Sequence, residues 1–361
     1  MNWLQKFVNS GLAVVVLLAV IPVDAGQIEL VPGVVVEEET VYMMNPDGAV
    51  DAVAIASGEV LWSSTAAAKP LVGDQDLLAC QVDEPAQSGM LEVVLLDRRT
   101  GMVRETMSLD LPTQVWAEVD ERLGRSFTVR GAALDDEVFL AWEHRRTRTS
   151  GLEPRPGEIE QETLDGAYRI DLAANVYEVT DLAAVEADPM GSVPDSVLAS
   201  LNQQEPGDVV VHTGETVAAI GFVIRDGQQQ MVLKRWNPET GEQLDEVDLV
   251  SGSHILELVS ADRKHLLVSQ RVAAGAWDEY RWTIFSLDTG QRLGAVGNHF
   301  SHARFFVHDS VLVYEASAYG RNLGGAWIEE PRRVRAVRLA GGTEVWEHPL
   351  RDTTFRGPFP P

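Results

Sequence analysis

Histidines near the C-terminal end of the chain are the residues whose type and spacing best suit a metal ion. His299 and His302 form the stretch His-Phe-Ser-His, and His308 follows. Neutral imidazole is a good ligand for zinc and related ions. In an extended strand, however, residues three positions apart point to opposite faces, and no carboxylate lies close by in the sequence to orient either ring. The sequence therefore predicts no metal site here.

Two polar stretches resemble the start of a calcium-binding loop: residues Asn45 to Gly48, and the pair Asp74 and Asp76. Neither has the later ligands of such a loop, and both lie where the chain needs a turn, so turn formation explains them. The chain also has no glycine-rich phosphate loop, no Gly-x-Ser-x-Gly elbow, and no order of Ser, His and Asp that isolates a triad. The sequence predicts no catalytic residue.

Cys80 is the only cysteine, so the chain has no internal disulfide and its core must supply the stability. The stretch from Leu77 to Cys80 resembles a lipidation motif, but it lies far beyond the N-terminal region where such a signal works. We expect Cys80 to be a small apolar residue in a buried strand, inaccessible to thiol reagents.

Residues 1–25 have the pattern of a secretory signal peptide. Lys6 and the amino terminus are positive, Gly11–Val23 is apolar, and Val23 and Ala25 provide the small residues of a cleavage site. The apolar run is shorter than the ~20 residues of a membrane span. This predicts cleavage after Ala25 and a periplasmic or secreted protein, with an uncleaved N-terminal anchor as the alternative. No later segment is apolar enough to span a bilayer.

The charge of the chain is strongly acidic, with a formal net charge of −26. The chain keeps this charge after cleavage, because Lys6 and Asp24 cancel. Binding to phosphates requires clustered Lys and Arg, so this balance argues against nucleic acid and anionic lipid as partners.

One type of turn recurs along the chain, each time after a short run rich in Val, Leu, Ile, Phe and Trp. Such runs, separated by Asp, Asn, Gly and Thr, are typical of short strands. The residues at which the chain reverses are Gly58, Gly101, Asn175, Gly241, Gly290 and Gly342. Gly and Asn are the residues that best adopt a positive φ, and Asp or Asn often opens the turn, as at Asp97, Asp171 and Asn237. We therefore expect six hairpins in register.

The first repeat is the clearest and divides into four strands, Val31–Val36, Thr40–Asn45, Ala49–Ile55 and Glu59–Ser63. Trp62 lies four residues after the turn glycine, as does Trp346 in the last repeat, whereas Glu105, Val179, Asp245 and Gly294 occupy that position elsewhere. This layout resembles the repeat of the pyrroloquinoline-quinone-like, or quinoprotein-type, β-propellers.

The resemblance implies an all-β fold with one β-propeller domain over residues 26–361, built from four-stranded antiparallel blades. Six blades are expected, at residues 31–65, 66–109, 110–182, 206–250, 251–297 and 298–350. Seven are left open if residues 27–30 and 351–361 build something extra. The short C-terminal tail is also suited to sealing the join between the last and first blades.

Inserted loops account for the long spacings between repeats, at residues 144–163, 182–207 and 316–332, and a shorter one covers 273–279. In a four-stranded blade, all these connections open on the face opposite the six tight turns. Loading of one face indicates a surface for recognition. Arginine and aromatic side chains are enriched at binding hot spots. The predicted contact residues are Arg145, Arg146, Arg148, Trp277, Tyr319, Arg321 and Trp327. For the three loop arginines, pairing with nearby Glu158–Glu162 is the alternative.

Two classes of function follow. The first is a non-catalytic scaffold that binds a protein or cell-envelope component. The alternative is an enzyme that uses the central funnel, either a quinoprotein-type oxidoreductase or a hydrolase. Enzymes of the resembled family often clamp their quinone with a disulfide between adjacent cysteines, and a chain with one cysteine lacks this clamp. No set of calcium ligands maps onto the sequence, so no cofactor is expected and the scaffold is favoured.

Overall fold

The chain folds into antiparallel β-sheets, as expected for the all-β class. The computed structural model describes residues 27–74, 76–82, 89–116, 124–134, 137–149, 159–171, 176–180, 209–252, 255–273, 279–323 and 326–351. Within these ranges the only helix is the four-residue α1 (Thr113–Trp116). No helix in the described part of the chain is long and apolar enough to cross a membrane.

Six sheets hold almost all of the strands. The first sheet contains β1 (Gln27–Val31), β2 (Val34–Glu37), β3 (Thr40–Met44), β4 (Val50–Ala54) and β5 (Val60–Ser64). The second contains β6 (Lys69–Asp74), β7 (Leu77–Gln81), β8 (Met90–Asp97) and β9 (Val103–Asp110). The third contains β10 (Gly124–Leu134), β11 (Glu137–Thr149), β12 (Ile159–Asp171) and β13 (Val176–Thr180).

The later sheets repeat the same order of strands. The fourth sheet contains β14 (Val209–His212), β15 (Val217–Arg225), β16 (Gln228–Trp236) and β17 (Gln243–Ser251). The fifth contains β18 (Ile255–Val259), β19 (His265–Ala273), β20 (Glu279–Ser286) and β21 (Arg292–Asn298). The sixth contains β22 (Phe305–His308), β23 (Val311–Ala316), β26 (Arg333–Arg338) and β27 (Glu344–Pro349), and β24 (Tyr319–Leu323) pairs only with β25 (Ala326–Glu330).

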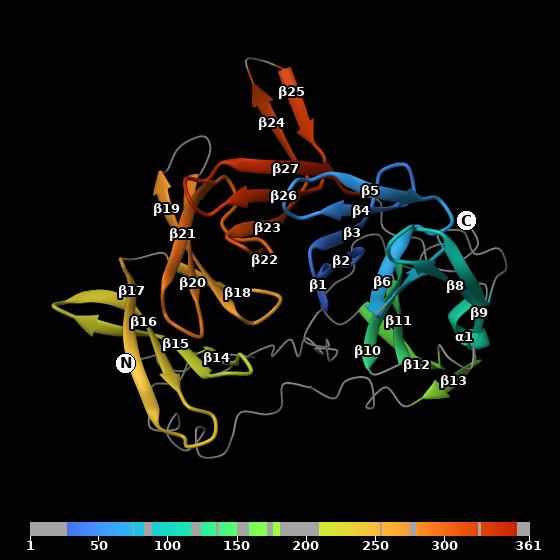
Figure 1. Ribbon diagram of the computed structural model, residues 1–361, viewed down its shortest axis with the longest axis horizontal. Helices are drawn as coiled ribbons and strands as arrows, with labels where there is room; N and C mark the ends of the chain where they lie inside the picture. The colour runs from blue at the N-terminus through green and yellow to red at the C-terminus, as the bar shows by residue number, and fades with distance from the viewer. Residues whose placement is uncertain are drawn as a thin grey trace, which may run out of the picture.

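Neighbouring sheets pack face to face, and they follow one another around a curve in Figure 1. Buried apolar clusters join the first sheet to the second, the second to the third, the fourth to the fifth, and the fifth to the sixth. Middle strands are consequently buried on both faces. In β3, Tyr42 packs toward the second sheet, whereas its neighbours Val41 and Met43 pack toward the sixth. Alternating side chains thus serve two different interfaces.

The sixth sheet also packs against the first. Phe306, Val334 and Trp346 share one buried cluster with Val36 and Met43. At the end of the described chain, the Arg351 N–H donates a hydrogen bond of 3.2 Å to the Met44 carbonyl. The start of the C-terminal tail therefore bonds to the first sheet, as the sequence suggested. Among the described residues, no apolar cluster spans the third and fourth sheets.

The predicted strands of the first repeat are confirmed to within one residue at each end, except that β2 begins three residues later than predicted. Gln27–Val31 adds a fifth strand to this sheet rather than part of a separate one. The predicted boundaries of the other five repeats agree with the observed sheets to within four residues, except that the third sheet begins only at Gly124 and the sixth only at Phe305. The preceding stretch contains α1.

Residues 144–163 were expected to form a loop, and that expectation is wrong for much of their length. β11 and β12 extend into the segment and pair with each other, and Arg146 faces Glu162 while Arg148 faces Glu160. Polar residues occupy successive positions here, so no apolar alternation marks the strands. Facing residues of opposite charge favour the pairing.

Residues 316–332 also contain strands instead of a loop. β24 and β25 form a hairpin between β23 and β26, and Figure 1 shows it projecting away from the sixth sheet. At its base, Arg333 forms an ion pair with Glu330 at 2.7 Å, and Arg332 forms one with Glu315 at 2.6 Å. The predicted signal peptide and the insertion at 182–207 lie outside the described residues.

The predicted turn glycines all have a positive φ, between 66° at Gly342 and 74° at Gly58. In each of the five turns, the glycine N–H bonds to the carbonyl four residues earlier, at 2.8–3.0 Å. Asn237 opens its turn as expected, since its Oδ1 accepts from two backbone N–H groups of the turn. Asn175 lies outside the described residues.

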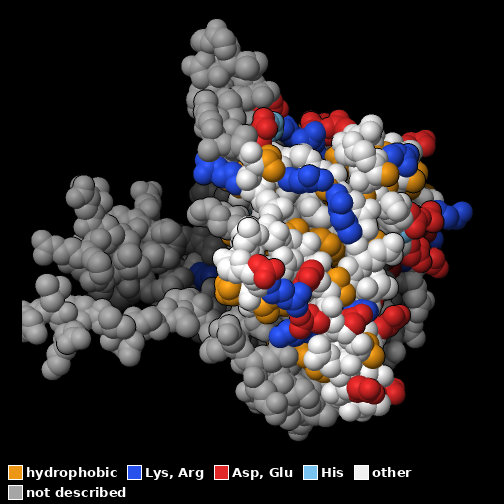
Figure 2. Space-filling view, turned by 90° about the vertical axis from the view of Figure 1, so that its left-hand side faces the viewer, with side chains coloured by type: hydrophobic (Ala, Val, Ile, Leu, Met, Phe, Trp, Pro, Cys, Tyr) orange, Lys and Arg blue, Asp and Glu red, His pale blue; other side chains and the backbone are white. Residues whose placement is uncertain are grey.

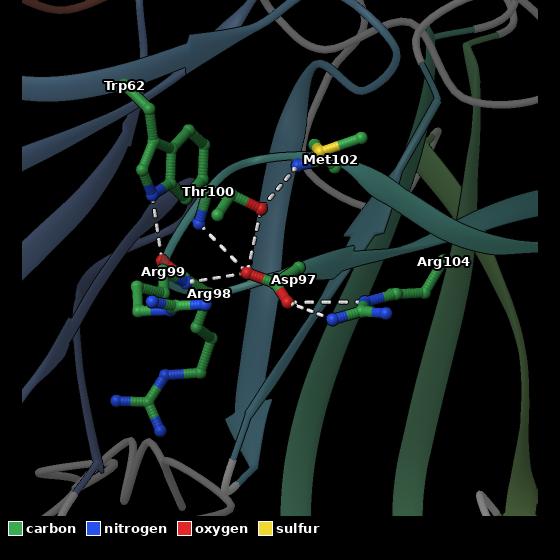
Figure 3. Close-up of polar contacts among 7 residues, drawn as sticks. All are labelled: Trp62, Asp97, Arg98, Arg99, Thr100, Met102 and Arg104. Atoms are coloured by element: carbon green, nitrogen blue, oxygen red, sulfur yellow. Dashed lines mark hydrogen bonds and ion pairs between the residues drawn. The ribbon is translucent and has the colours of Figure 1, made fainter.

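Asp97 opens the turn of the second sheet in the same way, as Figure 3 shows. Its Oδ1 accepts from the Arg99 N–H at 3.2 Å and from the Thr100 N–H at 2.9 Å, and its Oδ2 binds the Arg104 guanidinium. The Trp62 indole N–H, from the first sheet, donates to the Arg98 carbonyl at 2.7 Å. A tryptophan after one turn thus docks on the turn of the next sheet.

Other sheet junctions replace this tryptophan. Arg235, which is held by Asp245, donates to the carbonyl oxygen of Asp288 in the turn of the fifth sheet. Gly294 lies so close to the backbone of Leu339 that a side chain there would collide with it. The position four residues after the turn glycine thus remains a contact between sheets even where its residue is not tryptophan.

Candidate functional site

A groove of about 720 Å³ lies at one end of the fifth sheet. It is lined by β20 from Glu279 to Arg281, by β21 from Ala295 to Asn298, by Val272 and His299, and by Arg335 of the sixth sheet. This volume is in the range of ligand sites in proteins. The groove is therefore a candidate site for a ligand.

The groove runs over the edge of a sheet. β21 is the last strand of the fifth sheet and pairs only with β20. Ala295–Asn298 are consecutive, and consecutive strand residues point to opposite faces. They can line one groove together only if it follows the free backbone edge of β21. None of the described strands lies beside this edge, so its backbone N–H and C=O groups have no described strand as a partner.

One cross-strand pair of β20 and β21 has an empty side-chain position in the groove. Arg281 of β20 faces Gly297 of β21. A Cβ atom added at Gly297 would meet no atom within 4 Å. Arg281 is exposed, and its guanidinium has no ion pair or hydrogen bond to any described residue. The arrangement places a free cation beside a gap in the row of side chains.

The next rows provide an apolar wall. Tyr280 faces Asn298, and Trp282 faces Val296. Behind them, the Trp282 ring lies edge-on to Tyr314, with 5.1 Å between ring centroids. The Trp282 indole N–H donates to the Phe300 carbonyl at 2.8 Å, and Asn298 Oδ1 accepts from the His299 N–H at 2.8 Å. These contacts hold the end of β21 in place.

Arg335 fixes a second positive charge at the groove. It pairs with Glu344, and its Nε lies 2.9 Å from Glu347. Burial works to lower the pKa of Arg335, but the hydrogen bond to Glu344 and the nearby acidic groups raise it overall. Burial also raises the pKa of Tyr314, and the charge of Arg335 partly opposes that rise. Arg335 is therefore a permanent cation whose charge is already balanced.

Charged and apolar groups alternate on this side of the molecule. Figure 2 views it from the left-hand side of Figure 1, the side of the fourth and fifth sheets. A row of Lys and Arg side chains crosses the upper part of this face, with hydrophobic side chains next to it. In a chain of net charge −26, such a row forms a local attraction for acidic groups.

The structure separates the predicted contact residues into two groups. Arg145, Arg146 and Arg148 lie in β11 of the third sheet, which is across the molecule from β20 and β21 in Figure 1. Arg145 is exposed and forms an ion pair with Glu143 at 2.6 Å. The strand register sets Arg146 opposite Glu162 and Arg148 opposite Glu160, and the pairing of these arginines with Glu158–Glu162 stays a prediction.

The second group belongs to connections of the fifth and sixth sheets. Tyr319 and Arg321 lie in β24 and Trp327 lies in β25, the hairpin that leads into β26 and Arg335. Trp277 lies outside the described residues, in the connection between β19 and β20. Val272 and Glu279 stand on either side of that connection, and both line the groove. The insertion predicted at 273–279 thus adjoins lining residues of the groove.

The predicted insertions at 144–163, 273–279 and 316–332 all occupy the connection between the second and third strands of their sheets. This is the topological position expected for them. That they share one face of the molecule stays a prediction. The sequence did not single out Arg281, Gly297, Asn298 and Arg335. The uncharged run from Leu293 to Asn298 was the one available signal.

The residues considered for metals are placed differently. Asn45 Oδ1 accepts from the Asp47 N–H at 3.0 Å and from the Ala49 N–H at 2.9 Å, so this stretch is a turn. His299 lines the groove, and His302 lies near Ser301. Within the described ranges, no three His, Cys, Asp or Glu side chains are grouped to hold a metal ion.

Lys69 of β6 is a buried lysine whose pKa lies well below its usual value. Burial lowers its pKa to about 8. Its Nζ donates to the Val129 carbonyl at 3.1 Å, which links the second sheet to the third. The contact explains why a lysine is retained in the core, and it assigns Lys69 a structural role.

Comparison with known proteins finds no family model that matches this chain, and no curated protein matches it. Among solved structures, the computationally designed Ika8 protein is similar with 12% identity and a TM-score of 0.31, over 92% of this chain and 90% of that one. A europium-containing methanol dehydrogenase has 11% identity and a TM-score of 0.29, over 88% and 78%. Saccharomyces cerevisiae Sqt1 has 10% identity and a TM-score of 0.28, over 86% and 82%. At these scores the likenesses carry no argument, so the proposals below rest on the chain's own geometry.

Proposed function

We propose that the six sheets are the blades of one β-propeller and that the protein is an exported scaffold that binds a protein or cell-envelope component. The propeller is supported by the contact of Trp346 with Ile55, which repeats that of Trp62 with Arg98. In both cases the carbonyl lies three residues before a turn glycine. The last sheet therefore contacts the first as consecutive sheets contact each other.

The groove along β21 is the observation that carries the binding function. It combines a free strand edge, an apolar wall and an unpaired arginine, and its lining residues Val272 and Glu279 adjoin the connection between β19 and β20. Lengthening a loop costs little stability, so loops of this kind are free to serve recognition. Trp277, Tyr319, Arg321 and Trp327 are of the types that dominate binding energy at interfaces. We assign them to the rim that contacts the partner.

Export supports the choice of partner. The N-terminal segment has the pattern of a signal peptide, and the net charge of −26 disfavours nucleic acid and anionic lipid. With nucleic acid and anionic lipid disfavoured, we infer that the partner is a protein or another component of the cell envelope.

Affinity capture with the mature chain tests this function. Immobilised protein is incubated with envelope extract, and the same experiment is made with Trp277→Ala and Trp327→Ala. We expect a discrete partner that each variant retains about tenfold less strongly, as for a hot-spot residue. The melting temperature should be unchanged.

Tyr177→Ala is the matched control, because Tyr177 is an exposed aromatic residue of the third sheet, away from the groove. It should retain the partner fully. Equal capture by the wild type and both tryptophan variants would contradict the proposed rim, and capture no better than by an unrelated acidic protein would contradict the function itself.

A further inference from the structure

We propose that β21 accepts an extended segment of the partner protein as a fifth strand of the fifth sheet. This inference rests on the proposed binding function and names the way in which the groove is used. Strand addition of this kind takes its affinity from backbone hydrogen bonds and its specificity from alternate side chains. Both elements are present in the groove.

The exposed edge of β21 provides the backbone part. The groove follows this edge over Ala295–Asn298, and no charged residue occurs between Leu293 and Asn298. Natural sheets normally protect an open edge with charged side chains. The outer strands of the second, fourth and sixth sheets have such charges, namely Arg104, Glu105 and Asp110 in β9, Asp245, Glu246 and Asp248 in β17, and Glu344 and Glu347 in β27. β21 has a charge only at its start, Arg292, and β5 of the first sheet has none.

Arg281 determines the charge of the segment. An added strand would place one residue beside Gly297, in the row that Arg281 begins. Gly297 has no side chain, and the space above it is open. The long side chain of Arg281 can therefore reach across Gly297 to the incoming residue, as long side chains do between neighbouring rows. An aspartate or glutamate at that position would give the guanidinium its missing partner.

The residues on either side of that acidic position would point to the opposite face. There they would meet the wall made by Tyr280 and Val296. Apolar residues fit this wall. The groove thus selects an extended segment in which an acidic residue stands between two apolar ones.

A different protein is a better occupant than a second copy of this chain. Two copies of net charge −26 repel each other. A segment with one acidic residue can belong to a protein of any overall charge. The fold also tolerates the wider sheet, since the first sheet already contains five strands.

Hydrogen exchange on the mature chain tests the inference directly. The probe is the labelled peptide Ser-Thr-Val-Asp-Val-Thr-Ser, compared with the same peptide carrying Lys in place of Asp. Millimolar Asp peptide should slow amide exchange in β21 but not in β5 or β17. The Lys peptide should bind about tenfold more weakly, as expected for loss of a close charge pair. No slowing in β21 overturns the proposal.

Two variants with matched controls locate the site. Gly297→Trp fills the open position and should abolish the slowing of exchange, whereas Leu61→Trp adds the same ring to the exposed edge strand β5 and should not. Arg281→Glu should reverse the preference between the two peptides. Arg292→Glu makes the same charge change at the other end of β21, outside the groove, and should leave the preference intact. Equal effects of variant and control overturn the proposal.

Capture of the envelope partner by the variants tests this inference separately from the proposed binding function on which it rests. If Trp327→Ala weakens capture and Gly297→Trp does not, the scaffold stands and strand addition at β21 is wrong. Self-association of the chain in sedimentation, lost in Gly297→Trp, would identify a second copy as the occupant and would also overturn the inference. Loss of capture in Gly297→Trp, with Leu61→Trp unaffected, supports it.

Discussion

The indole N–H of Trp346 donates a 2.7 Å hydrogen bond to the carbonyl oxygen of Ile55. It joins the last strand that the structure describes to a turn of the first sheet. The ring of Trp346 is 7% exposed, and it packs on Gly58, whose N–H closes that turn. The contact therefore combines apolar burial with a buried polar bond.

Trp346→Phe should lower the free energy of unfolding by about 1–3 kcal/mol, because it leaves the buried Ile55 carbonyl without its donor. Trp62→Phe should cost less, since Trp62 is only partly buried and its partner carbonyl can be reached by water. Urea denaturation of the three proteins checks this order. A cost for Trp346→Phe no larger than that of an exposed surface substitution would show that the contact is dispensable.

Gly58→Ala should destabilise the protein more than Gly227→Ala. Both glycines have a φ of 74°, so both variants bear the cost of a left-handed alanine, about 1–2 kcal/mol. A Cβ at Gly58 would also collide with Trp346, whereas at Gly227 it would meet nothing within 4 Å. The collision should add about 1–3 kcal/mol. Thermal unfolding of the two variants measures the difference, and equal melting temperatures would rule the collision out.

Asp97 should contribute to acid stability. Its hydrogen bonds with Arg104 and then Thr100 lower its pKa from 3.8 to about 2. A lowered pKa in the folded state stabilises the protein above the unfolded pKa, and this contribution is lost as the pH falls from about 4 to about 2. Asp97→Asn should therefore remove that part of the pH dependence. Unfolding free energies across this range check it, and parallel curves for the two proteins would refute it.

Lys69 should make the protein more stable as the pH rises from about 8 to about 10.5. Burial lowers its pKa from 10.5 to about 8. Between these two values the unfolded chain keeps the proton that the folded protein has lost, so the free energy of unfolding rises with pH. The full effect is about 3 kcal/mol. Lys69→Met should flatten the pH profile in this window. A profile that keeps its slope in the variant would assign the effect to other groups.

Cys80 should not react with a thiol reagent in the folded protein. The side chain is fully buried, and burial raises the pKa of the thiol, which keeps the reactive thiolate scarce. Labelling should become fast only in denaturant. Fast labelling of the native protein would show that the core between the first and second sheets opens readily.

Local features of the sequence determined most of the fold. A positive φ is nearly confined to Gly and Asn, so Gly58, Gly101, Gly241, Gly290 and Gly342 marked their turns without any knowledge of the rest. Apolar alternation marked the strands between them, because side chains of a strand point to opposite faces in turn. These signals require only neighbours in the chain, and they gave the repeat boundaries to within four residues except at the start of the third and sixth sheets.

The tertiary structure alone decided the rest. The hairpin of β11 and β12 sets residues such as Arg146 and Glu162 opposite each other, in a polar stretch that shows no apolar alternation. The groove depends on Arg281, Gly297 and Arg335, which come from three strands of two sheets. Gly297 is unremarkable in the sequence and becomes a gap only when β20 places Arg281 beside it. Strand register and sheet packing create such neighbours, and they arise from contacts between residues far apart in the chain.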